Sequence, residues 1–282
     1  MHYFAQYIRC TAIGLTRFFP NRMKHKYLAL FLISFICFPS LLFAWGQKGH
    51  RIIAQVAYQH LSKKATKQVN AILGEHGMVY WANWPDEIKS DTIYPISYGW
   101  HFQDLPADLT DEQMFATLTD YPTHGGNLWR TLDSLKTRLR QDPRQHDALV
   151  FLIHLTGDSY CPMHIGHEDD LGGNRVKMKW FANNTNLHRV WDEHLIQSRG
   201  YSYTEYAQYL EDTFSQEKSH ILQTPHQQAM LENYRLTSAI YNYQEHFDGN
   251  TYHYIYRWHT DCERQLYRAG LHLAQLLNSL YK

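Results

Sequence analysis

The chain has 282 residues, of which 44% are hydrophobic, and this is enough for one sizeable globular core without a second domain. Its 27 basic and 27 acidic residues balance, but five of the basic residues and none of the acidic ones precede residue 45. The part from residue 45 onward therefore has 22 basic against 27 acidic residues, a formal charge of −5, which argues against binding polyanions by bulk electrostatics.

Residues 1–44 have the pattern of a secretory signal peptide. A basic segment precedes an apolar run over residues 27–43, and the small residue Ala44 stands where a signal peptidase would cut. The run is about 17 residues long, at the short limit for a membrane span, so a membrane anchor is the alternative. Met23 could be the true start, because residues 1–22 add nothing that a signal needs. We expect residues 45–282 to form an exported, periplasmic or secreted monomer without membrane attachment.

The first two predicted helices follow soon after residue 45. Apolar residues recur at helical spacing over residues 50–61, which indicates an amphipathic helix. A second helix over residues 62–74 begins at Ser62, whose hydroxyl can accept a hydrogen bond from a free backbone amide. It ends at Gly74, which tolerates a left-handed backbone.

The remaining segments are also mostly helical, and neither repeats nor linkers divide them. A small β-hairpin is predicted over residues 169–181, where alternating residues lie between Gly-Gly and Asn-Asn. The other predicted elements are, in chain order, a turn into a short helix near 85–89, an extended or loop segment at 97–104, and helices at 110–118, 126–141, 145–161, from 186 onward, 202–215, 217–240 and 246–280. The sequence thus predicts one all-α, mostly helical domain with a hairpin insertion.

Two cysteines, Cys161 and Cys262, follow residue 44. They allow one disulfide in an oxidising compartment, or two free buried thiols. The sequence leaves both alternatives open, but it excludes a disulfide framework.

One segment, residues 154–164, combines imidazole and carboxylate groups at the end of an apolar helical run. His154 and Asp158 are four residues apart, so they lie on the same helix face. Pro162 ends or bends the helix, and His164 then comes from the next turn. Such donors suit a zinc ion. The alternative is a core helix with a buried histidine and an aspartate that caps the following turn.

Histidine is unusually frequent, with 19 residues, and several stand where they can converge with this segment. His188 and Asp192 repeat the four-residue spacing on another predicted helix. Cleavage after Ala44 would add the free amino group of Trp45. Nine candidate ligands result: Trp45, His50, Asp86, His101, His154, Asp158, His164, His188 and Asp192. Three zinc ions with three protein groups each, sharing Asp158, would leave positions open for water, as catalytic zinc sites do.

These motifs resemble those of a known family, the zinc-dependent single-strand nucleases of fungi and plants (nuclease S-one/P-one type), which are related to bacterial zinc phospholipase C. The matching pieces occur in order over about 150 residues of the chain. They are Trp45-Gly-x-x-Gly-His50, Trp81-Ala-x-x-x-Asp86, His101-Phe-x-Asp104, His154-x-x-x-Asp158 with His164, Gly172-Gly-Asn174 and His188-x-x-x-Asp192. Two departures are visible: Asp86 follows Asn-Trp-Pro rather than Trp-Ala directly, and the disulfides of eukaryotic members are impossible here.

The resemblance implies three zinc ions per chain and phosphoester hydrolysis of single-stranded DNA and RNA to 5′-nucleotides, with 3′-nucleotidase activity. It assigns one zinc to Asp86, His101, His154 and Asp158, its close neighbour to the Trp45 amino and carbonyl groups, His50 and Asp158, and the third to His164, His188 and Asp192. Asp158 would thus be shared at the catalytic centre, where two close zinc ions lower the pKa of a shared water.

The resemblance also implies contacts with the substrate. Lys89 would support the reacting phosphate, and its alternative is a solvated helix lysine. Phe102 would stack a base, and Asp104 would accept hydrogen bonds from its edge. The alternative for Phe102 is plain core packing. Leu171 would form the opposite apolar wall, and Asn174 would brace the site.

Three other functions remain open at this point. A zinc phospholipase C is the nearest, although that group tends to have glutamate at the position of Asp192 and lacks the His-Phe-x-Asp pattern. A secreted zinc-binding protein without catalysis would bind metal but would not hydrolyse 3′-AMP. A purely structural helical protein would bind no metal.

Overall fold

The computed structural model describes residues 45–282 apart from residues 90, 92 and 121–125. The predicted signal peptide, residues 1–44, lies outside the described residues. Among the described residues, no helix is both long enough and apolar enough to cross a membrane.

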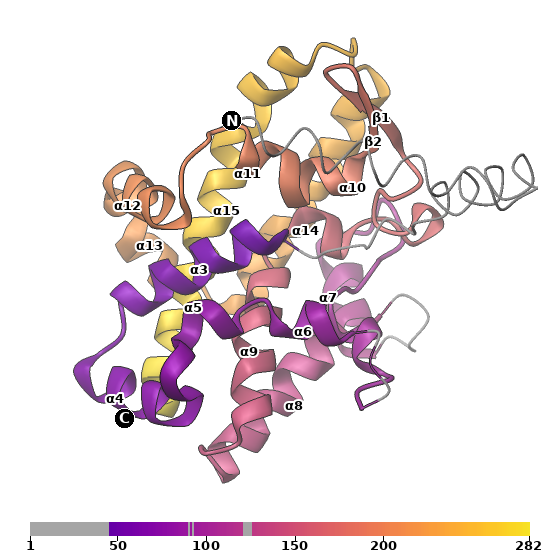
Figure 1. Cartoon of the computed structure of the whole chain (residues 1–282). Helices are drawn as coiled ribbons and strands as arrows, with labels where there is room; N and C mark the ends of the chain where they lie inside the picture. Colours follow the sequence, from indigo (N-terminus) through magenta and orange to yellow (C-terminus); the bar gives the residue numbers. More distant parts are fainter. Residues whose placement is uncertain (1–44, 90, 92, 121–125) are drawn as a thin grey trace, which may run out of the picture. The chain divides into compact units, whose positions relative to one another are not determined.

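Helices make up most of the described chain, and one two-stranded antiparallel sheet interrupts them (Figure 1). The α-helices are α3 (Gln47–Gln59), α4 (Lys63–Leu73), α5 (Gly77–Trp81), α6 (Trp84–Ile88), α7 (Asp111–Asp120), α8 (Leu128–Gln141), α9 (His146–Asp158), α10 (Leu187–Arg189), α11 (Leu195–Gln197), α12 (Tyr203–Phe214), α13 (Lys218–Gln223), α14 (His226–Glu245) and α15 (Thr251–Leu280). The strands are β1 (Lys177–Trp180) and β2 (Asn183–Asn186). Short 3-10 turns are η1 (Gly74–His76), η2 (Ser97–Trp100), η3 (Pro162–Ile165), η4 (Glu168–Asp170) and η6 (Ser215–Glu217), and η5 (Val190–His194) is a π-helical turn. The predicted all-α class with a hairpin insertion is confirmed.

Helix boundaries follow the predicted capping chemistry where a cap is present. The Ser62 side chain accepts a hydrogen bond from the amide of Ala65, and Gly74 ends α4 with a φ of 70°. At α12, Ser202 and Glu205 form the reciprocal bonds of a capping box. These local signals explain why the ends of both helices lie close to their predicted positions.

Three predicted elements differ from the structure. The segment predicted as one helix over residues 217–240 is two helices, α13 and α14, because Pro225 cannot continue a helix from the residues before it. The hairpin lies about six residues later than predicted, with Lys177 pairing with Asn186 and Trp180 with Asn183. The loop predicted at 97–104 begins with the 3-10 turn η2.

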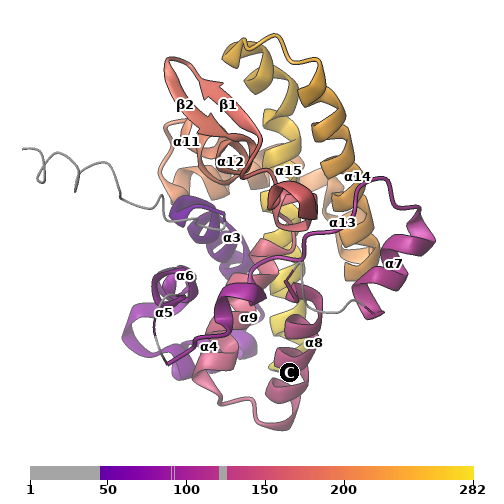
Figure 2. The ribbon, with the colours of Figure 1, turned by 90° about the vertical axis from the view of Figure 1, so that its right-hand side faces the viewer.

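The core forms around α15, the longest helix, which packs against α3, α9, α12 and α13. The crossing with α3 is close because Gly270 has no side chain: a Cβ there would lie 2.5 Å from Val56 Cγ1 and 3.1 Å from the Ile53 carbonyl oxygen. Helix α9 runs through the same core, and every residue from Ala148 to Asp158 is buried. The hairpin lies at the other end of the described unit from the C terminus (Figure 2). The core therefore fixes α3 and α9 rigidly against each other.

Candidate metal centre

The C-terminal turn of α9 presents the first two donors. His154 and Asp158 are both fully buried, and the His154 Nε2 atom lies 3.3 Å from Asp158 Oδ2, as the four-residue spacing predicts. Cys161 and Pro162 then start η3, which returns His164 to the same place, with its Nδ1 atom 3.7 Å from Asp158 Oδ1. The segment from residue 154 to 164 thus wraps three donors around one point.

Two further donors reach Asp158 from separate loops. The His101 Nδ1 atom lies 3.1 Å from Asp158 Oδ2, 3.6 Å from Asp86 Oδ1 and 3.0 Å from His154 Nε2. Asp86 is on α6, directly after Pro85 in the first helical turn, and its Oδ1 atom lies 3.7 Å from His154 Nε2. The unusual Asn-Trp-Pro sequence before Asp86 therefore places the carboxylate in the cluster.

His50 of α3 completes this cluster from the opposite side. Its Nε2 atom lies 3.2 Å from Asp158 Oδ1, and its ring stacks on His154 with centroids 3.8 Å apart. Gly157 permits this approach, since a Cβ at residue 157 would lie 3.1 Å from His50 Nδ1. His50, Asp86 and His154 each contribute a donor atom to a group that lies within 4.8 Å, as do His101, His154 and Asp158.

Trp45 is buried beside these ligand-bearing segments. Its indole nitrogen donates a 2.8 Å hydrogen bond to the Gly157 carbonyl, and the next residue, Gly46, donates from its amide to the Asp192 carbonyl at 2.8 Å. These two bonds hold the chain between α9 and η5. In the chain as described, the Trp45 nitrogen is part of the peptide bond to residue 44.

A second cluster forms around Asp192, which lies in the π-helical turn η5. The His188 Nε2 atom lies 2.9 Å from Asp192 Oδ2, and His164 Nε2 lies 3.7 Å from Asp192 Oδ1. The thiol of Cys161 donates to Asp192 Oδ1 at 3.1 Å, and Cys161, His164 and Asp192 form a third group of donors within 4.8 Å. Single π turns are frequent at functional sites, where they redirect a side chain.

Hydrogen bonds to backbone carbonyls hold three of the histidine rings in the way that is typical of metal-binding histidines. The Nδ1 atoms of His154, His164 and His188 donate to backbone carbonyls of Ala82, His101 and Gly172, at 2.6, 2.6 and 2.7 Å. This fixes the tautomer and leaves each Nε2 atom as a lone-pair donor directed into the site.

Several buried polar atoms in the two clusters make no hydrogen bond within the described part of the chain. They are His50 Nε2, Asp86 Oδ2, His101 Nε2, Asp158 Oδ1, His164 Nε2 and Asp192 Oδ2. Buried polar atoms without hydrogen-bond partners destabilise a fold. The presence of six such atoms in these two clusters therefore indicates that cations bind to them. Imidazole nitrogens and carboxylate oxygens fit zinc in both charge and donor type.

The electrostatics of the site agree with this fit. Burial alone would raise the pKa of Asp158, but His154 and His164 hold it well below its ordinary value. Burial would lower the pKa of His164, yet Asp158 and Asp192 raise it to about 9. Burial and the neighbouring His154 lower the pKa of His50 to about 4. The carboxylates thus attract positive charge, which a bound dication would provide in place of protons.

The residues predicted to contact substrate lie around these clusters. The Lys89 ammonium lies 3.4 Å from Asp86 Oδ1, and its side chain is 10% exposed, so it is not a solvated helix lysine. Phe102 is partly buried and contacts Tyr98 edge to face, with ring centroids 5.6 Å apart. Asp104 is buried, and burial raises the pKa of its carboxyl to about 8.

A hydrogen bond joins the side chain of Asn174 to the backbone of Leu171. Leu171 is half exposed and has a left-handed backbone with φ of 58°, which is uncommon for a residue with a branched side chain. The Asn174 amide donates to the Leu171 carbonyl at 2.8 Å, and so it supports that conformation. The side-chain amide of Asn174 thus supports the backbone at Leu171.

The cluster around Asp192 includes Cys161, which the sequence analysis did not identify as a site residue. Cys161 stands three residues after Asp158 and three before His164, a spacing that could have indicated its inclusion. The structure places both cysteines as free, buried thiols, so the disulfide alternative is not realised. Tyr98, the half-exposed neighbour of Phe102, was also not identified, because it belongs to a loop without periodicity.

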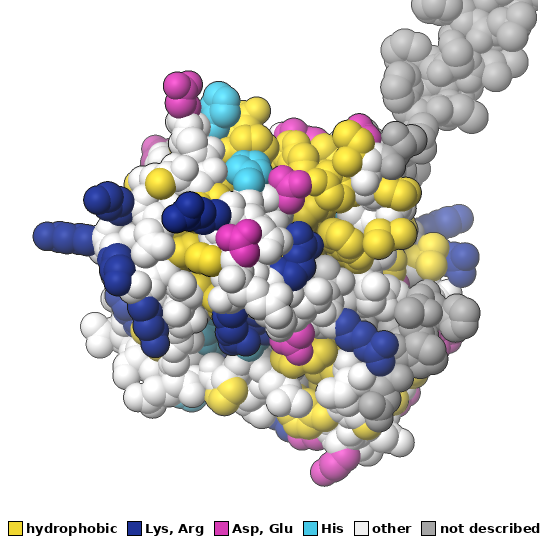
Figure 3. Space-filling view, turned by 90° about the horizontal axis from the view of Figure 1, so that it is seen from below, with side chains coloured by type: hydrophobic (Ala, Val, Ile, Leu, Met, Phe, Trp, Pro, Cys, Tyr) yellow, Lys and Arg dark blue, Asp and Glu magenta, His cyan; other side chains and the backbone are white. Residues whose placement is uncertain are grey.

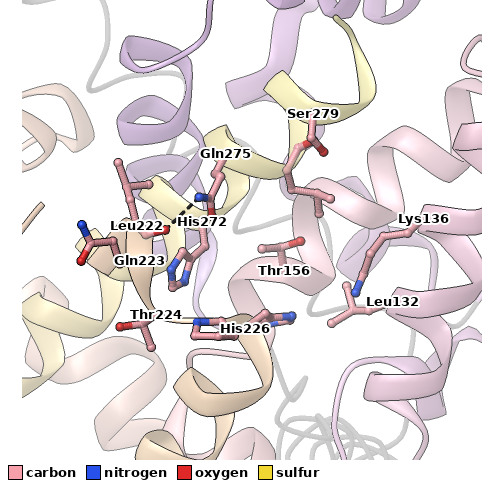
Figure 4. Close-up of a pocket in the computed structure, with 12 residues that line it drawn as sticks. Leu132, Lys136, Thr156, Leu222, Gln223, Thr224, His226, His272, Gln275 and Ser279 are labelled. Atoms are coloured by element: carbon pink, nitrogen blue, oxygen red, sulfur yellow. Dashed lines mark hydrogen bonds between the residues drawn. The ribbon is translucent and has the colours of Figure 1, made fainter. Parts of the chain in front are cut away.

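A separate cavity of about 440 Å³ lies among α8, α9, α13, α14 and α15 (Figure 4). Its lining includes His226, His272, Lys136 and Thr156 but none of the predicted metal ligands. Elsewhere, Figure 3 shows lysine and arginine side chains dispersed over one face, on which hydrophobic side chains gather in a separate area. That face thus has no continuous basic patch.

Comparisons with known proteins agree with the motifs. Residues 45–282 match the S1/P1 Nuclease family. Endonuclease 3 of Arabidopsis thaliana is 29% identical over 61% of this chain and 62% of its own length. Nuclease S1 of Aspergillus oryzae is 25% identical over 58% of each chain, and Nuclease P1 of Penicillium citrinum is 26% identical over 54% of this chain and 58% of its own. The chain thus spans about three fifths of the length of these relatives. Because the family match covers the whole described unit, the chain belongs to the S1/P1 nuclease family.

Proposed function

We propose that this protein is an exported, zinc-dependent nuclease that hydrolyses single-stranded DNA and RNA to 5′-nucleotides and also removes the phosphate from 3′-nucleotides. The observation that carries the proposal is the convergence of buried imidazole and carboxylate donors, several without hydrogen-bond partners, around Asp158 and Asp192. Relatives in the same family are named as nucleases and endonucleases, which supports the reaction type. We further propose that residues 1–44 are removed during export.

Three zinc ions are proposed. Asp86, His101, His154 and Asp158 would hold one ion. His50, the shared Asp158 and the amino and carbonyl groups of Trp45 would hold its close neighbour. His164, His188 and Asp192 would hold the third. When bound, these ions would lower the pKa of water towards neutrality and neutralise charge on the phosphate.

The chain's own groups would then position the phosphodiester. Lys89 projects beside Asp86 and supplies a positive charge to a phosphate oxygen, in an otherwise acidic protein. Helices α3 and α9 hold His50, His154 and Asp158 on a rigid core, so the donors need no rearrangement when substrate binds.

Single-strand preference would come from a base-binding site beside the metal centre. A base can stack on Phe102 only when it is not paired within a duplex. Asp104 has a buried carboxyl that would accept hydrogen bonds from the base edge. Leu171, supported by Asn174, provides an apolar wall.

The central test uses protein that begins at Trp45. We expect three zinc ions per chain, together with hydrolysis of single-stranded DNA and of 3′-AMP. Both activities should disappear after chelation and return with zinc, while duplex DNA should be cut far more slowly. Activity that survives complete removal of metal would overturn the proposal.

A matched control tests the amino-terminal ligand. Protein that begins at Ala44 differs by one residue, but its Trp45 nitrogen is an amide and cannot act as an amine ligand. We expect this protein to bind one zinc ion fewer or to bind it more weakly, with reduced activity. Equal metal content and activity for the two proteins would remove Trp45 from the ligand set.

The same preparation decides between the remaining functions. Hydrolysis of phosphatidylcholine in place of nucleic acid would indicate a phospholipase C. Tight metal binding without hydrolysis of either substrate would indicate a metal-binding protein without catalysis.

A further inference from the structure

The cluster around Asp192 contains a sulfur atom that the nine predicted ligands do not include. Cys161 is completely buried, and its Sγ atom lies 3.1 Å from Asp192 Oδ1. The backbone fixes this position, since the Cys161 amide donates to the Asp158 carbonyl at 2.9 Å and the His164 amide donates to the Cys161 carbonyl at 3.1 Å. The sulfur is therefore held in place by the same turn that presents His164.

The donor atoms lie close enough together to bind one ion. Donors bound at ~2.0–2.3 Å to a tetrahedral zinc lie roughly 3.3–3.8 Å from one another. Here Asp192 Oδ1 lies 3.7 Å from His164 Nε2, which is within that range, and 3.1 Å from Cys161 Sγ. Asp192 Oδ2 lies 2.9 Å from His188 Nε2. The last two separations are hydrogen-bond distances, shorter than that range. Both His164 Nε2 and Asp192 Oδ2 are buried without a hydrogen bond within the described residues, as is expected of atoms that bind an ion.

The other cysteine of the described chain provides the contrast. Cys262, on α15, is equally buried in the same hydrophobic core, but it belongs to none of the donor groups found among the described residues. Burial of a thiol alone therefore does not explain the placement of Cys161 against a carboxylate and an imidazole.

We propose that Cys161 is a ligand of the third metal ion, so that this site has two nitrogen donors, one oxygen donor and one sulfur donor. The inference rests on the proposed metal centre and changes the character of one of its sites. As the metal–sulfur bond forms, the thiol proton leaves to solvent. A thiolate donor shifts the preference of the site towards softer ions such as cadmium and strengthens its hold on zinc.

The test replaces zinc with cobalt and cadmium in protein that begins at Trp45. Cobalt bound by Cys161 should give a sulfur-to-cobalt charge-transfer band in the near ultraviolet, and one bound cadmium ion should show the NMR shift of a sulfur-ligated ion. The variant Cys161→Ser keeps a hydroxyl that can donate to Asp192, but it should lose the band and weaken cobalt binding at one site by about 100-fold or more. Cys262→Ser is the matched control and should retain both signals.

The outcomes separate this inference from the proposed function. A charge-transfer band that disappears in Cys161→Ser supports the inference even if the protein cuts no nucleic acid. A wild-type protein without the band, whose cobalt affinity equals that of Cys161→Ser, overturns it even if the protein is an active nuclease. In that case the thiol only donates a hydrogen bond to Asp192. Failure of the protein to bind cobalt or cadmium would overturn the inference together with the metal centre.

Discussion

Two sets of buried histidines in this protein look alike in sequence and differ in their hydrogen bonds. In the metal centre, His164 bonds the His101 carbonyl through Nδ1, and its Nε2 atom faces Asp192 without a hydrogen bond among the described residues. In the cavity of Figure 4, both ring nitrogens of His272 are bonded, Nδ1 to the Tyr160 hydroxyl and Nε2 to the Ile221 carbonyl at 2.7 Å. His226 bonds the Ser159 hydroxyl at 3.0 Å.

The difference shows which histidines are available to a metal. A ring with both nitrogens bonded inside the protein, such as His272, has no lone pair to offer, and His226 has no carboxylate among the residues that line its cavity. His164 differs from both, because one nitrogen orients the ring and the other faces Asp192. The number of histidines therefore cannot locate a metal site, but the group that each ring's second nitrogen faces can. Each prediction below tests this contrast.

The largest effect is expected from Asp158→Asn. The carboxylate of Asp158 lies within 3.7 Å of ring nitrogens of His50, His101, His154 and His164. Its loss should lower kcat/KM on single-stranded DNA by at least about 100-fold and reduce the zinc content. Loss of a group that only orients a metal ligand lowers activity by about 10–100-fold, and loss of the ligand itself should lower activity at least as much. Steady-state kinetics and elemental analysis measure both. Near-normal activity would show that Asp158 is not shared between ions.

Removal of metal should destabilise the fold as well as abolish activity. The buried donor atoms are then left without partners, and stabilisation by each bound ion is lost. That loss is about 4 kcal/mol for an ion present at about 1,000 times its Kd. Thermal and urea unfolding before and after chelation measure it. Identical unfolding curves would mean that the cluster is stable without a cation.

His272→Gln should separate stability from metal binding. Glutamine cannot replace both bonds of the imidazole, so we expect a loss of about 1–3 kcal/mol in the free energy of unfolding. The zinc content should stay unchanged, whereas His154→Gln should lower it. If His272→Gln lost zinc instead, the contrast between the two sets of histidines would fail.

The last prediction concerns the pH dependence of stability. Burial, with the nearby charges of Lys136 and His272, lowers the pKa of His226 from 6.5 to about 3. Between these values the unfolded chain binds a proton that the folded chain does not. Wild-type stability should therefore fall as the pH decreases from 6.5, by up to about 1.4 kcal/mol per pH unit from this residue. In His226→Asn this contribution is absent, so the difference between the two unfolding free energies should change with pH. A constant difference would contradict the prediction.

The sequence predicted the parts of the site that depend on local geometry. The four-residue spacings of His154 with Asp158 and of His188 with Asp192 placed each pair correctly, because helix periodicity alone decides it. Helix α9 ends at Asp158, three residues before its predicted end at residue 161, and Pro162 begins the next turn, η3, which carries His164. These features require no knowledge of tertiary packing.

Other features depended on packing and could not be derived in the same way. Asp86 and His101 come from separate loops, so their approach to Asp158 was expected from a family resemblance and not from periodicity. The predicted bounds of the hairpin were wrong because the alternating pattern extends across residues that form turns in the structure. The sulfur of Cys161 was overlooked, since its neighbour Asp192 is distant in sequence.

The buried position of Trp45 has a consequence for when the protein works. Its indole donates a hydrogen bond to the Gly157 carbonyl of α9, the helix that carries His154 and Asp158. Residue 45 therefore occupies this position while it is still joined to residue 44. If its freed amine is a ligand as proposed, an unprocessed chain is a latent form that lacks one donor. The cell that makes the protein would then be spared damage to its own transcripts until the chain has left the cytoplasm.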